Sequence, residues 1–309
     1  MPKLSVIIPC YFNEENIPVT ARQLIENEPL FEAGTEFEYI WVDDASGDKT
    51  WEKLKVCWEM YPGKMKLIRL VKNAGAFNAI LAGLHLSGGD VNVILTADLQ
   101  DPPELIPAMF AHWQKGYKLI IANRQDRQEP VGQKMLSRIF HSIIRRLAVP
   151  NAPSGGFDLV LFDRKLKEEV IKMDEKNTNI LYLLVWLGYE YVNIPYTRRK
   201  REIGTSRWTL SKKIKMFIDT IIAFSFFPVR LISVFGILLG ILAFLYGVFI
   251  IIARLTGWIQ VEGWSALMVV LLFVSAFQMI ALGVLGEYVW RTMDASRKRP
   301  NFLIQEMLP

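Results

Sequence analysis

Two long stretches near the C-terminal end carry no charged residue, and they limit what this 309-residue chain can fold into. The first has 23 residues between Arg230 and Arg254, and the second has 24 residues between Glu262 and Glu287. A helix needs about 20 apolar residues to cross a hydrocarbon core. Each stretch can therefore span a membrane, which excludes a wholly soluble protein. The first 200 residues contain no comparable run, which excludes a polytopic transporter.

Positive charge gathers beside these stretches. The net charge is +5, but segment 198–219 alone carries +6 and segment 291–299 carries +3, which leaves −4 for the rest. Positive charge that flanks apolar stretches indicates contact with a membrane surface, and it argues against a nucleic-acid partner. Because Lys and Arg favour the cytoplasmic flanks of membrane spans, we expect both outer ends of the pair in the cytoplasm and connection 254–262 outside.

The first 195 residues alternate short β-rich runs with helical stretches. Strands are expected at 4–8, 38–42, 66–70, 91–95 and 118–122, and helices at 16–27, 50–61, 76–86 and 103–115. This alternation predicts an α/β fold with a mainly parallel sheet. Ligands bind such sheets at the carboxyl ends of the strands. Polar clusters at 13–15, 43–48, 73–75 and 98–101 follow four of the expected strands, and we expect the site there.

Four regions are expected along the chain: an α/β domain over 1–206, a juxtamembrane segment over 207–227, two transmembrane helices over 228–290 and a tail over 291–309. In the juxtamembrane segment, apolar residues recur at helical spacing while lysines fall largely off that stripe. This pattern is typical of an amphipathic helix in the plane of the membrane surface. The alternative is a helix that packs on the α/β domain. The stripe consists of Leu210, Ile214, Phe217, Ile221 and Phe224.

Cysteine and histidine exclude several kinds of chemistry. Cys10 and Cys57 are too few for a disulfide framework, and the three histidines have no zinc-ligand spacing. The apolar run at 4–8 soon meets glutamates and is too short for the core of a signal peptide. We therefore expect the N-terminal part to stay in the cytoplasm.

The strongest local motif, LTADLQDPPE at 95–104, directly follows an expected strand. Asp98 and Gln100 alternate, so both can point to one side, and oxygen ligands of this kind suit Mg²⁺ or Mn²⁺. The alternative is that Asp101 merely caps a helix with Pro in its first turn. Both interpretations can hold together, with Asp101 as the cap and Asp98 and Gln100 as metal ligands.

Five motifs in chain order carry a resemblance: VIIPCYFNE at 6–14, VDDASGDKT at 42–50, NAG at 73–75, ADLQDPP at 97–103 and GTSR at 204–207. This set resembles the family 2 glycosyltransferases. More narrowly, with the two C-terminal spans, the chain resembles the bacterial polyprenyl-phosphate glycosyltransferases related to dolichyl-phosphate mannose synthase. The resemblance implies a GT-A type nucleotide-sugar domain, a Mg²⁺ or Mn²⁺ cofactor and a multi-pass protein of the bacterial inner membrane. It further implies inverting transfer from a UDP-sugar to polyprenyl (undecaprenyl) phosphate for cell-envelope glycan modification, and a homotetramer.

The resemblance also assigns the donor site by position. Asp44 would bind the uracil or ribose, with Pro9 and Glu14 beside it. Asp98 and Gln100 would hold the metal on the diphosphate, next to Ala97. Two arginines around Gly204 would bind phosphates, because a planar guanidinium engages phosphate oxygens in pairs. These are Arg201 and Arg207, whereas the other basic residues of 198–201 would lie at the membrane surface.

The residues expected at the acceptor end of the site are Asp158, Arg124 and Arg127. Asp158 is the acidic residue close to the position of the catalytic base proposed in relatives. A phosphate monoester has a second pKa near about 6, so it needs little deprotonation at neutral pH. We expect Asp158 to orient the acceptor or a neighbouring arginine as much as it takes a proton, and the alternative is a turn residue before a strand. Arg124 and Arg127 would bind the donor diphosphate or the lipid phosphate, or pair with nearby carboxylates.

One departure from the family pattern keeps other functions open. Thr96 stands where the family commonly has an acidic residue, which leaves a metal with fewer carboxylates. This motivates a catalytically weak, nucleotide-sugar-binding regulator as one alternative. The other alternative is a membrane glycosyltransferase with a saccharide acceptor, although such relatives have more spans and a QxxRW motif that this sequence lacks.

Overall fold

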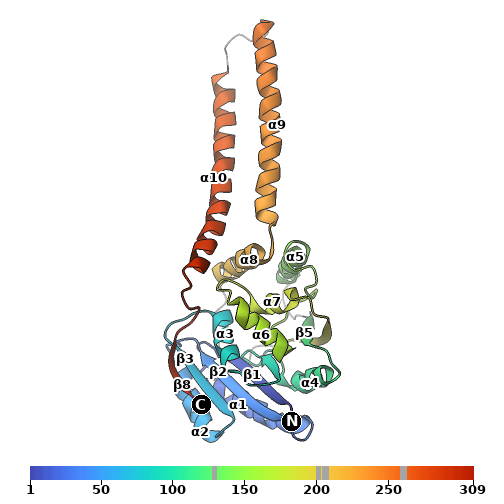
Figure 1. The fold of residues 1–309 in the computed structure, drawn as a ribbon, viewed down its shortest axis with the longest axis vertical. Helices are drawn as coiled ribbons and strands as arrows, with labels where there is room; N and C mark the ends of the chain where they lie inside the picture. The colour runs from blue at the N-terminus through green and yellow to red at the C-terminus, as the bar shows by residue number, and fades with distance from the viewer. Residues whose placement is uncertain (127–130, 200–202, 204–208, 258–262) are drawn as a thin grey trace. The chain divides into compact units, whose positions relative to one another are not determined.

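The computed structural model describes residues 1–126, 131–199, 203, 209–257 and 263–309. These residues form two compact units (Figure 1). The first unit holds residues 1–223 together with 300–309, and the second holds residues 224–299.

The first unit is built on an eight-stranded sheet in the order β7-β5-β6-β4-β1-β2-β3-β8. The β4-β1-β2-β3 neighbours pair in parallel, as do β5 and β7, whereas β6 runs antiparallel to both of its neighbours and β8 runs antiparallel to β3. The expected mainly parallel α/β sheet is confirmed. The strands are β1 (Lys3–Cys10), β2 (Glu36–Asp43), β3 (Met65–Leu70), β4 (Val91–Ile94), β5 (Leu119–Asp126), β6 (Val160–Asp163), β7 (Tyr191–Thr197) and β8 (Ile304–Leu308).

Helices cover both faces of this sheet. On one face, α1, α2 and α4 pack against β1 and β2 through a core that contains Trp41, Trp51 and Phe110. On the other face, α3 packs against Ile40 and Val42 of β2. Because strands covered on both faces bury most of their side chains, they are nearly continuous apolar runs. The helices are α1 (Ile17–Glu26), α2 (Thr50–Met60), α3 (Ala76–Leu86), α4 (Ile106–Gln114), α5 (Val131–Leu147), α6 (Arg164–Met173), α7 (Ile180–Trp186) and α8 (Leu210–Phe224), with 3₁₀ turns η1 (Glu28–Leu30) and η2 (Pro103–Leu105).

Helix α8 combines features of both interpretations of the juxtamembrane segment. Ile221 is buried in the first unit, and the ring of Phe217 lies 5.5 Å from that of Phe140 in α5. Ile214 and Ile218 nevertheless remain 51% and 45% exposed. The helix therefore packs on the α/β unit through one edge and keeps other apolar side chains exposed.

The C-terminal strand β8 extends the sheet, a role that the sequence analysis did not foresee for the expected tail. β8 pairs antiparallel with β3, and the Val71 amide donates to the Leu303 carbonyl at 2.9 Å. Two indoles of α2 also hold this end: Trp51 Nε1 donates to Glu306 and Trp58 Nε1 donates to the Pro309 carbonyl. The chain thus returns to the first unit after its two long apolar helices.

Neighbouring residues of β8 provide a test of this packing. Leu308 packs against the core, whereas Met307 is 51% exposed. We expect Leu308→Ser to lower the free energy of unfolding by about 1 kcal/mol, because part of a leucine side chain is buried. That corresponds to a melting temperature about 2–4 °C lower for a domain of this size. Differential scanning fluorimetry of the full chain in detergent measures the shift, and Met307→Ser is the control. Equal shifts for both variants would show that β8 does not pack on the core.

The second unit consists of α9 (Phe227–Leu255) and α10 (Trp264–Ser296). Their segments Phe227–Ala253 and Leu267–Ser296 have mean hydropathies of 2.8 and 2.5, with apolar side chains exposed along their length. Both helices are long and apolar enough to cross a membrane. α9 begins at Phe227, one residue before the start at 228 that was expected for the transmembrane helices.

Candidate functional site

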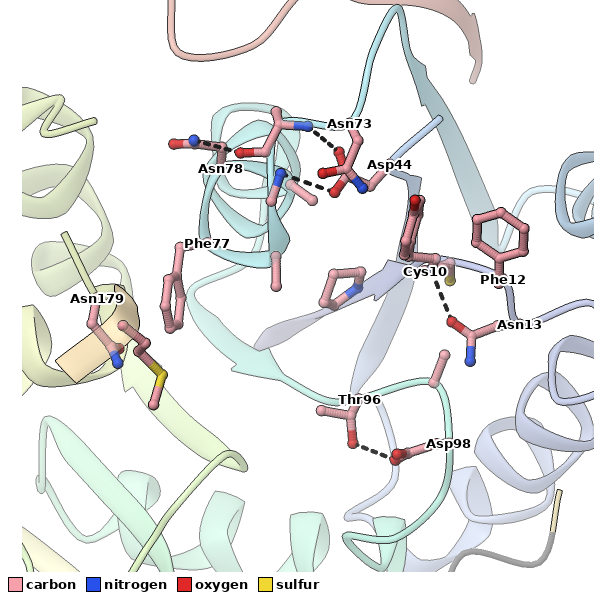
Figure 2. A pocket seen from close by; sticks show the side chains of 18 of the residues that line it. Cys10, Phe12, Asn13, Asp44, Asn73, Phe77, Asn78, Thr96, Asp98 and Asn179 are labelled. Atoms are coloured by element: carbon pink, nitrogen blue, oxygen red, sulfur yellow. Dashed lines mark hydrogen bonds between the residues drawn. The ribbon is translucent and has the colours of Figure 1, made fainter. Parts of the chain in front are cut away.

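A pocket of about 630 Å³ opens at the carboxyl ends of β1, β2 and β4, the edge at which the polar clusters were expected (Figure 2). Its lining combines the loops after these strands with the start of α3, the segment before α7, and α8. The described lining residues are Pro9–Asn16, Asp44, Asp48, Asn73–Ala79, Thr96–Asp98, Lys176–Asn179, Ile203, Lys215, Met216, Asp219 and Thr220.

One end of the pocket is formed by Asp44, directly after β2. Its carboxylate accepts hydrogen bonds from the backbone N–H of Ala74 at 2.6 Å and of Gly75 at 3.0 Å. Gly75 has a φ of +91°, a conformation that glycine adopts readily and that lets both amides face the carboxylate. Burial raises the pKa of Asp44 to about 6, although the two backbone hydrogen bonds oppose the shift. The carboxylate is thereby fixed in place beside the open pocket.

The loop after β1 forms the adjoining wall and is held by a hydrogen bond within itself and by hydrogen bonds to the segment between β2 and α2. Phe12 has a φ of +56°, and its amide donates to Ser46 Oγ at 3.0 Å. Asn13 Oδ1 accepts from the Tyr11 amide, and Glu14 accepts from the Lys49 amide. A non-glycine residue keeps a positive φ only where surrounding contacts hold it, and such residues concentrate at functional sites. Pro9 and Glu14 both line the pocket, as the sequence analysis expected.

The opposite end is formed by the loop after β4. Asp98 lines the pocket, and its Oδ1 lies 2.9 Å from Thr96 Oγ1 (Figure 2). The same oxygen lies 3.3 Å from the Gln100 amide nitrogen. Ala97 lines the pocket as well, but Gln100 is not among its described lining residues. The Gln100 side chain instead donates to the Arg199 carbonyl at 3.3 Å. Asp98 and Gln100 therefore point to different surroundings in this structure.

Asp101 does not cap a helix, and this part of the sequence interpretation is wrong. In the described structure η2 has Pro102 at its N-cap position and no side-chain cap. The Asp101 carboxylate is buried and accepts a hydrogen bond from the Tyr196 hydroxyl. The Tyr196 hydroxyl and two nearby guanidinium groups take up this carboxylate in place of the backbone amides of a helix N-terminus.

The residues at this end fit a divalent ion that is held by few protein ligands and completes its coordination with substrate phosphates and water. Among the described residues, no group of three or more His, Cys, Asp or Glu side chains could hold a metal by itself. The carboxylate of Asp98 is instead compatible with Mg²⁺, which commonly uses one or two protein carboxylates together with substrate phosphates and water. The donor set therefore suits an ion that arrives with a diphosphate.

Asp158 and Arg124 lie together but are not among the described residues lining the pocket. Arg124 Nη2 donates to Asp158 Oδ2, and the Arg124 side chain is only 6% exposed. Arg198 Nη2 lies 3.4 Å from the same carboxylate oxygen. Of the alternatives for Arg124, the structure shows the pairing with a nearby carboxylate. Arg127, Arg201 and Arg207 lie outside the described residues.

Sequence reasoning missed two contributions to the site. Arg198 was interpreted as membrane-surface charge, yet it faces the carboxylates of Asp158 and Asp101. In addition, α8 supplies four lining residues, and the helical period identified α8 without indicating which edge would face a pocket. These lining residues are Lys215, Met216, Asp219 and Thr220.

Residues 5–230 match the family described as Glycosyl transferase family 2. The chain belongs to this family. The mainly parallel sheet, with its pocket at the carboxyl ends of the strands, agrees with the GT-A type domain implied by the sequence motifs.

Relatives match this family 2 chain over nearly its whole length. The prophage bactoprenol glucosyl transferase homolog of Escherichia coli (strain K12) is 30% identical over 306 residues, which cover 99% of each chain. The undecaprenyl-phosphate 4-deoxy-4-formamido-L-arabinose transferase of Klebsiella pneumoniae subsp. pneumoniae is 30% identical over 308 residues, covering 99% of this chain and 94% of the relative.

Among solved structures, the mannosyltransferase PcManGT from Pyrobaculum calidifontis, in complex with GDP-Man and Mn²⁺, is 20% identical with a TM-score of 0.44. That match covers 63% of this chain and 55% of the other.

Proposed function

We propose that this family 2 glycosyltransferase moves a sugar from a UDP-sugar to polyprenyl phosphate, with undecaprenyl phosphate as the acceptor. The observation that carries the proposal is the pocket itself. It brings Asp44 and Asp98 to one sheet edge and is completed by α8, an amphipathic helix directly before two membrane-length helices. The family and the names of its full-length relatives support the same class of reaction.

The donor fits the pocket through complementary groups at its two ends. An ionised Asp44, already accepting two backbone N–H groups, has remaining lone pairs for an N–H of uracil or a ribose hydroxyl. Asp98 would hold Mg²⁺ or Mn²⁺ on the diphosphate. On this proposal the Gln100 side chain turns away from the Arg199 carbonyl to become the second ligand. The bound ion would supply Lewis-acid neutralisation of the leaving diphosphate.

The acceptor phosphate attacks the anomeric carbon as the bond to the UDP oxygen breaks, so the configuration inverts. At neutral pH a phosphate monoester is mostly dianionic and needs orientation more than deprotonation. Asp158 is paired with Arg124 and lies close to Arg198, and this pairing supports a role in holding guanidinium groups toward the acceptor. On this proposal the rate changes little between about pH 6.5 and 8, and Asp158→Asn retains most of the activity, because no general base is lost.

The path of the chain supports a hairpin anchor with the α/β unit and both termini in the cytoplasm. β8 lies in the same sheet as β1, so the chain leaves and re-enters one folded unit on either side of α9 and α10. Two crossings therefore bring it back to the side from which it started. The inner membrane and a homotetramer belong to the same proposal.

An assay of the purified full chain tests the proposed reaction. The enzyme is incubated with a panel of UDP-sugars, undecaprenyl phosphate and Mg²⁺ or Mn²⁺, and both UDP and lipid-linked sugar are quantified. We expect UDP release that requires the metal and the lipid phosphate together, with one sugar strongly preferred. Turnover onto a water-soluble saccharide would instead identify the alternative transferase, and absence of turnover with every donor would favour the regulator.

Lys215 of α8 provides a test of the acceptor end. It lines the pocket, whereas Lys213 lies on the same helix and is not among the described lining residues. A cation near an anionic lipid headgroup contributes about 1 kcal/mol, so we expect Lys215→Met to raise KM for undecaprenyl phosphate about fivefold. KM for the UDP-sugar should stay unchanged, and Lys213→Met should leave both constants unchanged. An increase confined to the UDP-sugar KM would place Lys215 at the donor instead.

A further inference from the structure

Two aspartates and two arginines form a closed group next to the loop that carries Asp98. Arg124 contacts Asp158 and has its Nε 3.8 Å from Asp101 Oδ1. Arg198 has its Nε 3.5 Å from the same Asp101 oxygen and its Nη2 3.4 Å from Asp158. Each carboxylate thus faces both guanidinium groups. We refer to Asp101, Arg124, Asp158 and Arg198 as the ion square.

Tyr196, near the end of β7, links two members of the ion square. Its hydroxyl accepts a hydrogen bond from Arg124 Nε at 3.2 Å and donates one to Asp101 Oδ1. Burial, followed by the charge of Asp101, raises the pKa of Tyr196 well above its ordinary value. The phenol therefore keeps its proton at neutral pH and can maintain both hydrogen bonds.

Thr96 connects the ion square to Asp98 on the loop after β4. Its Oγ1 lies 2.9 Å from Asp98 Oδ1 and 3.2 Å from Asp101 Oδ2. A hydroxyl has one hydrogen to donate, so Thr96 serves one of these carboxylates at a time. A continuous series of contacts runs from Asp98 through Thr96, Asp101 and Tyr196 to Arg124 and Asp158. It joins the loop after β4 with β5, β7 and the segment before β6.

Burial makes the geometry of this group restrictive. The side chain of Asp101 is 1% exposed, and an unpaired carboxylate in such a place would be strongly unfavourable. Its hydrogen bond from Tyr196 and the two nearby guanidinium groups therefore fix its position. Asp158 and Arg198 are the more exposed members, at 35% and 25%, so the square has one buried edge and one edge toward solvent.

We propose that Tyr196 is a positioning residue for sugar transfer. By holding Arg124 against Asp101, it keeps Arg124 and Asp158 at a fixed separation from the Asp98 loop. The acceptor phosphate and the donor's anomeric carbon then meet in reactive alignment. The inference rests on the proposed function, because it requires Arg124 and Asp158 to serve the acceptor. Misplacement of reacting groups by about 1 Å can lower a rate about a hundredfold.

The variant Tyr196→Phe removes one hydroxyl and keeps the buried ring. We expect kcat for transfer to undecaprenyl phosphate to fall by about ten- to a hundredfold. KM for the UDP-sugar and metal-dependent UDP binding should remain at wild-type values, because neither Asp44 nor Asp98 contacts Tyr196 in the described hydrogen bonds. The matched control is Tyr191→Phe, since Tyr191 lies on the same strand and its hydroxyl donates to the Asn151 carbonyl.

A double-mutant cycle and a chemical probe separate positioning from general damage. Asp101→Asn keeps the Oδ1 acceptor but removes the charge that strengthens its hydrogen bond from Tyr196 and that faces Arg124 and Arg198, so it should also lower kcat. Combining it with Tyr196→Phe should lower kcat by less than the product of the two single losses, because both substitutions act on the hydrogen bond between Tyr196 and Asp101. Phenylglyoxal, which modifies arginine, should react faster at Arg124 in Tyr196→Phe than in the wild type or in Tyr191→Phe, as measured by mass spectrometry.

Wild-type kcat in Tyr196→Phe, additive losses in the double variant, or unchanged modification of Arg124 would each overturn the inference. A parallel fall in UDP affinity would also do so, since it would indicate a general structural defect. If the wild-type enzyme fails to glycosylate undecaprenyl phosphate, the proposed function fails. The rate of Arg124 modification then still decides whether Tyr196 holds that side chain.

Discussion

Replacing Asp98 with asparagine is expected to lower sugar transfer by about a hundredfold or more, the effect of removing one preorganised electrostatic contact from a reacting site. Asparagine keeps the Oδ1 acceptor that faces Thr96 and the Gln100 amide, so the loop after β4 should retain its conformation. The substitution removes the negative charge that a divalent ion requires. Thr96 makes this loss more severe, because it leaves this end of the pocket without the second acidic residue common in the family.

The measurement is initial-rate transfer to undecaprenyl phosphate as a function of Mn²⁺ concentration. We expect Asp98→Asn to require more Mn²⁺ for half-maximal activity and to remain below the wild-type rate at saturation. Asp90→Asn is the matched control, since Asp90 precedes the same strand, is 42% exposed and pairs with Arg164 at the opposite end of β4. If Asp98→Asn has the wild-type rate and metal dependence, Asp98 is not a metal ligand.

The parts of the fold that were predictable are those governed by local periodicity. The short apolar runs around Val6, Trp41 and Val93 are typical of buried strands, and their alternation with helical stretches predicts a parallel sheet. β8 was not predictable in this way. It is a short segment whose edge position depends on β3 and on two indoles more than 250 residues away along the chain.

The candidate site was predictable where a motif lies on one loop and not where it depends on distant loops. Asp44 and Asp98 line the pocket because Asp44 directly follows β2 and Asp98 lies on the loop after β4, a strand of the same sheet. Arg198 and Tyr196 join Asp101 and Asp158 only because β7 pairs with β5, a register that no local pattern specifies. Asp101 has a sequence context typical of a helix cap, and tertiary partners override that preference.

The affinity for UDP is expected to fall as the pH drops through about 6, because Asp44 must be ionised to accept an N–H from the base. Its pKa is about 6 in the folded protein against an ordinary value of 3.8, and burial is the main cause. Protonation therefore removes an acceptor from the pocket under mildly acidic conditions. Below this pKa, the contribution of Asp44 to the binding constant should decrease by up to about tenfold per pH unit.

The same shift has the opposite sign for stability. A carboxyl whose folded pKa is raised binds more protons in the folded state than in the unfolded state between about pH 4 and 6. Its stabilising contribution is fully present below pH 4 and is lost as the pH rises through 6. An N–H donor from bound UDP favours the ionised carboxylate, so UDP binding lowers the pKa of Asp44. We therefore expect UDP binding near pH 5.5 to release a proton from Asp44.

Isothermal titration calorimetry of UDP at saturating Mn²⁺, between pH 5 and 8, provides the test. The phosphate groups of UDP also titrate in this range, so the informative quantity is the difference between the wild type and Asp44→Asn. The asparagine presents an NH₂ group toward one of the two backbone amides, and loss of that hydrogen bond should weaken binding by about tenfold at pH 7.5. Because the asparagine side chain does not titrate, the ratio of the two affinities should shrink as the pH is lowered. A ratio that stays constant from pH 5 to 8 would show that the ionisation of Asp44 does not govern recognition of the base.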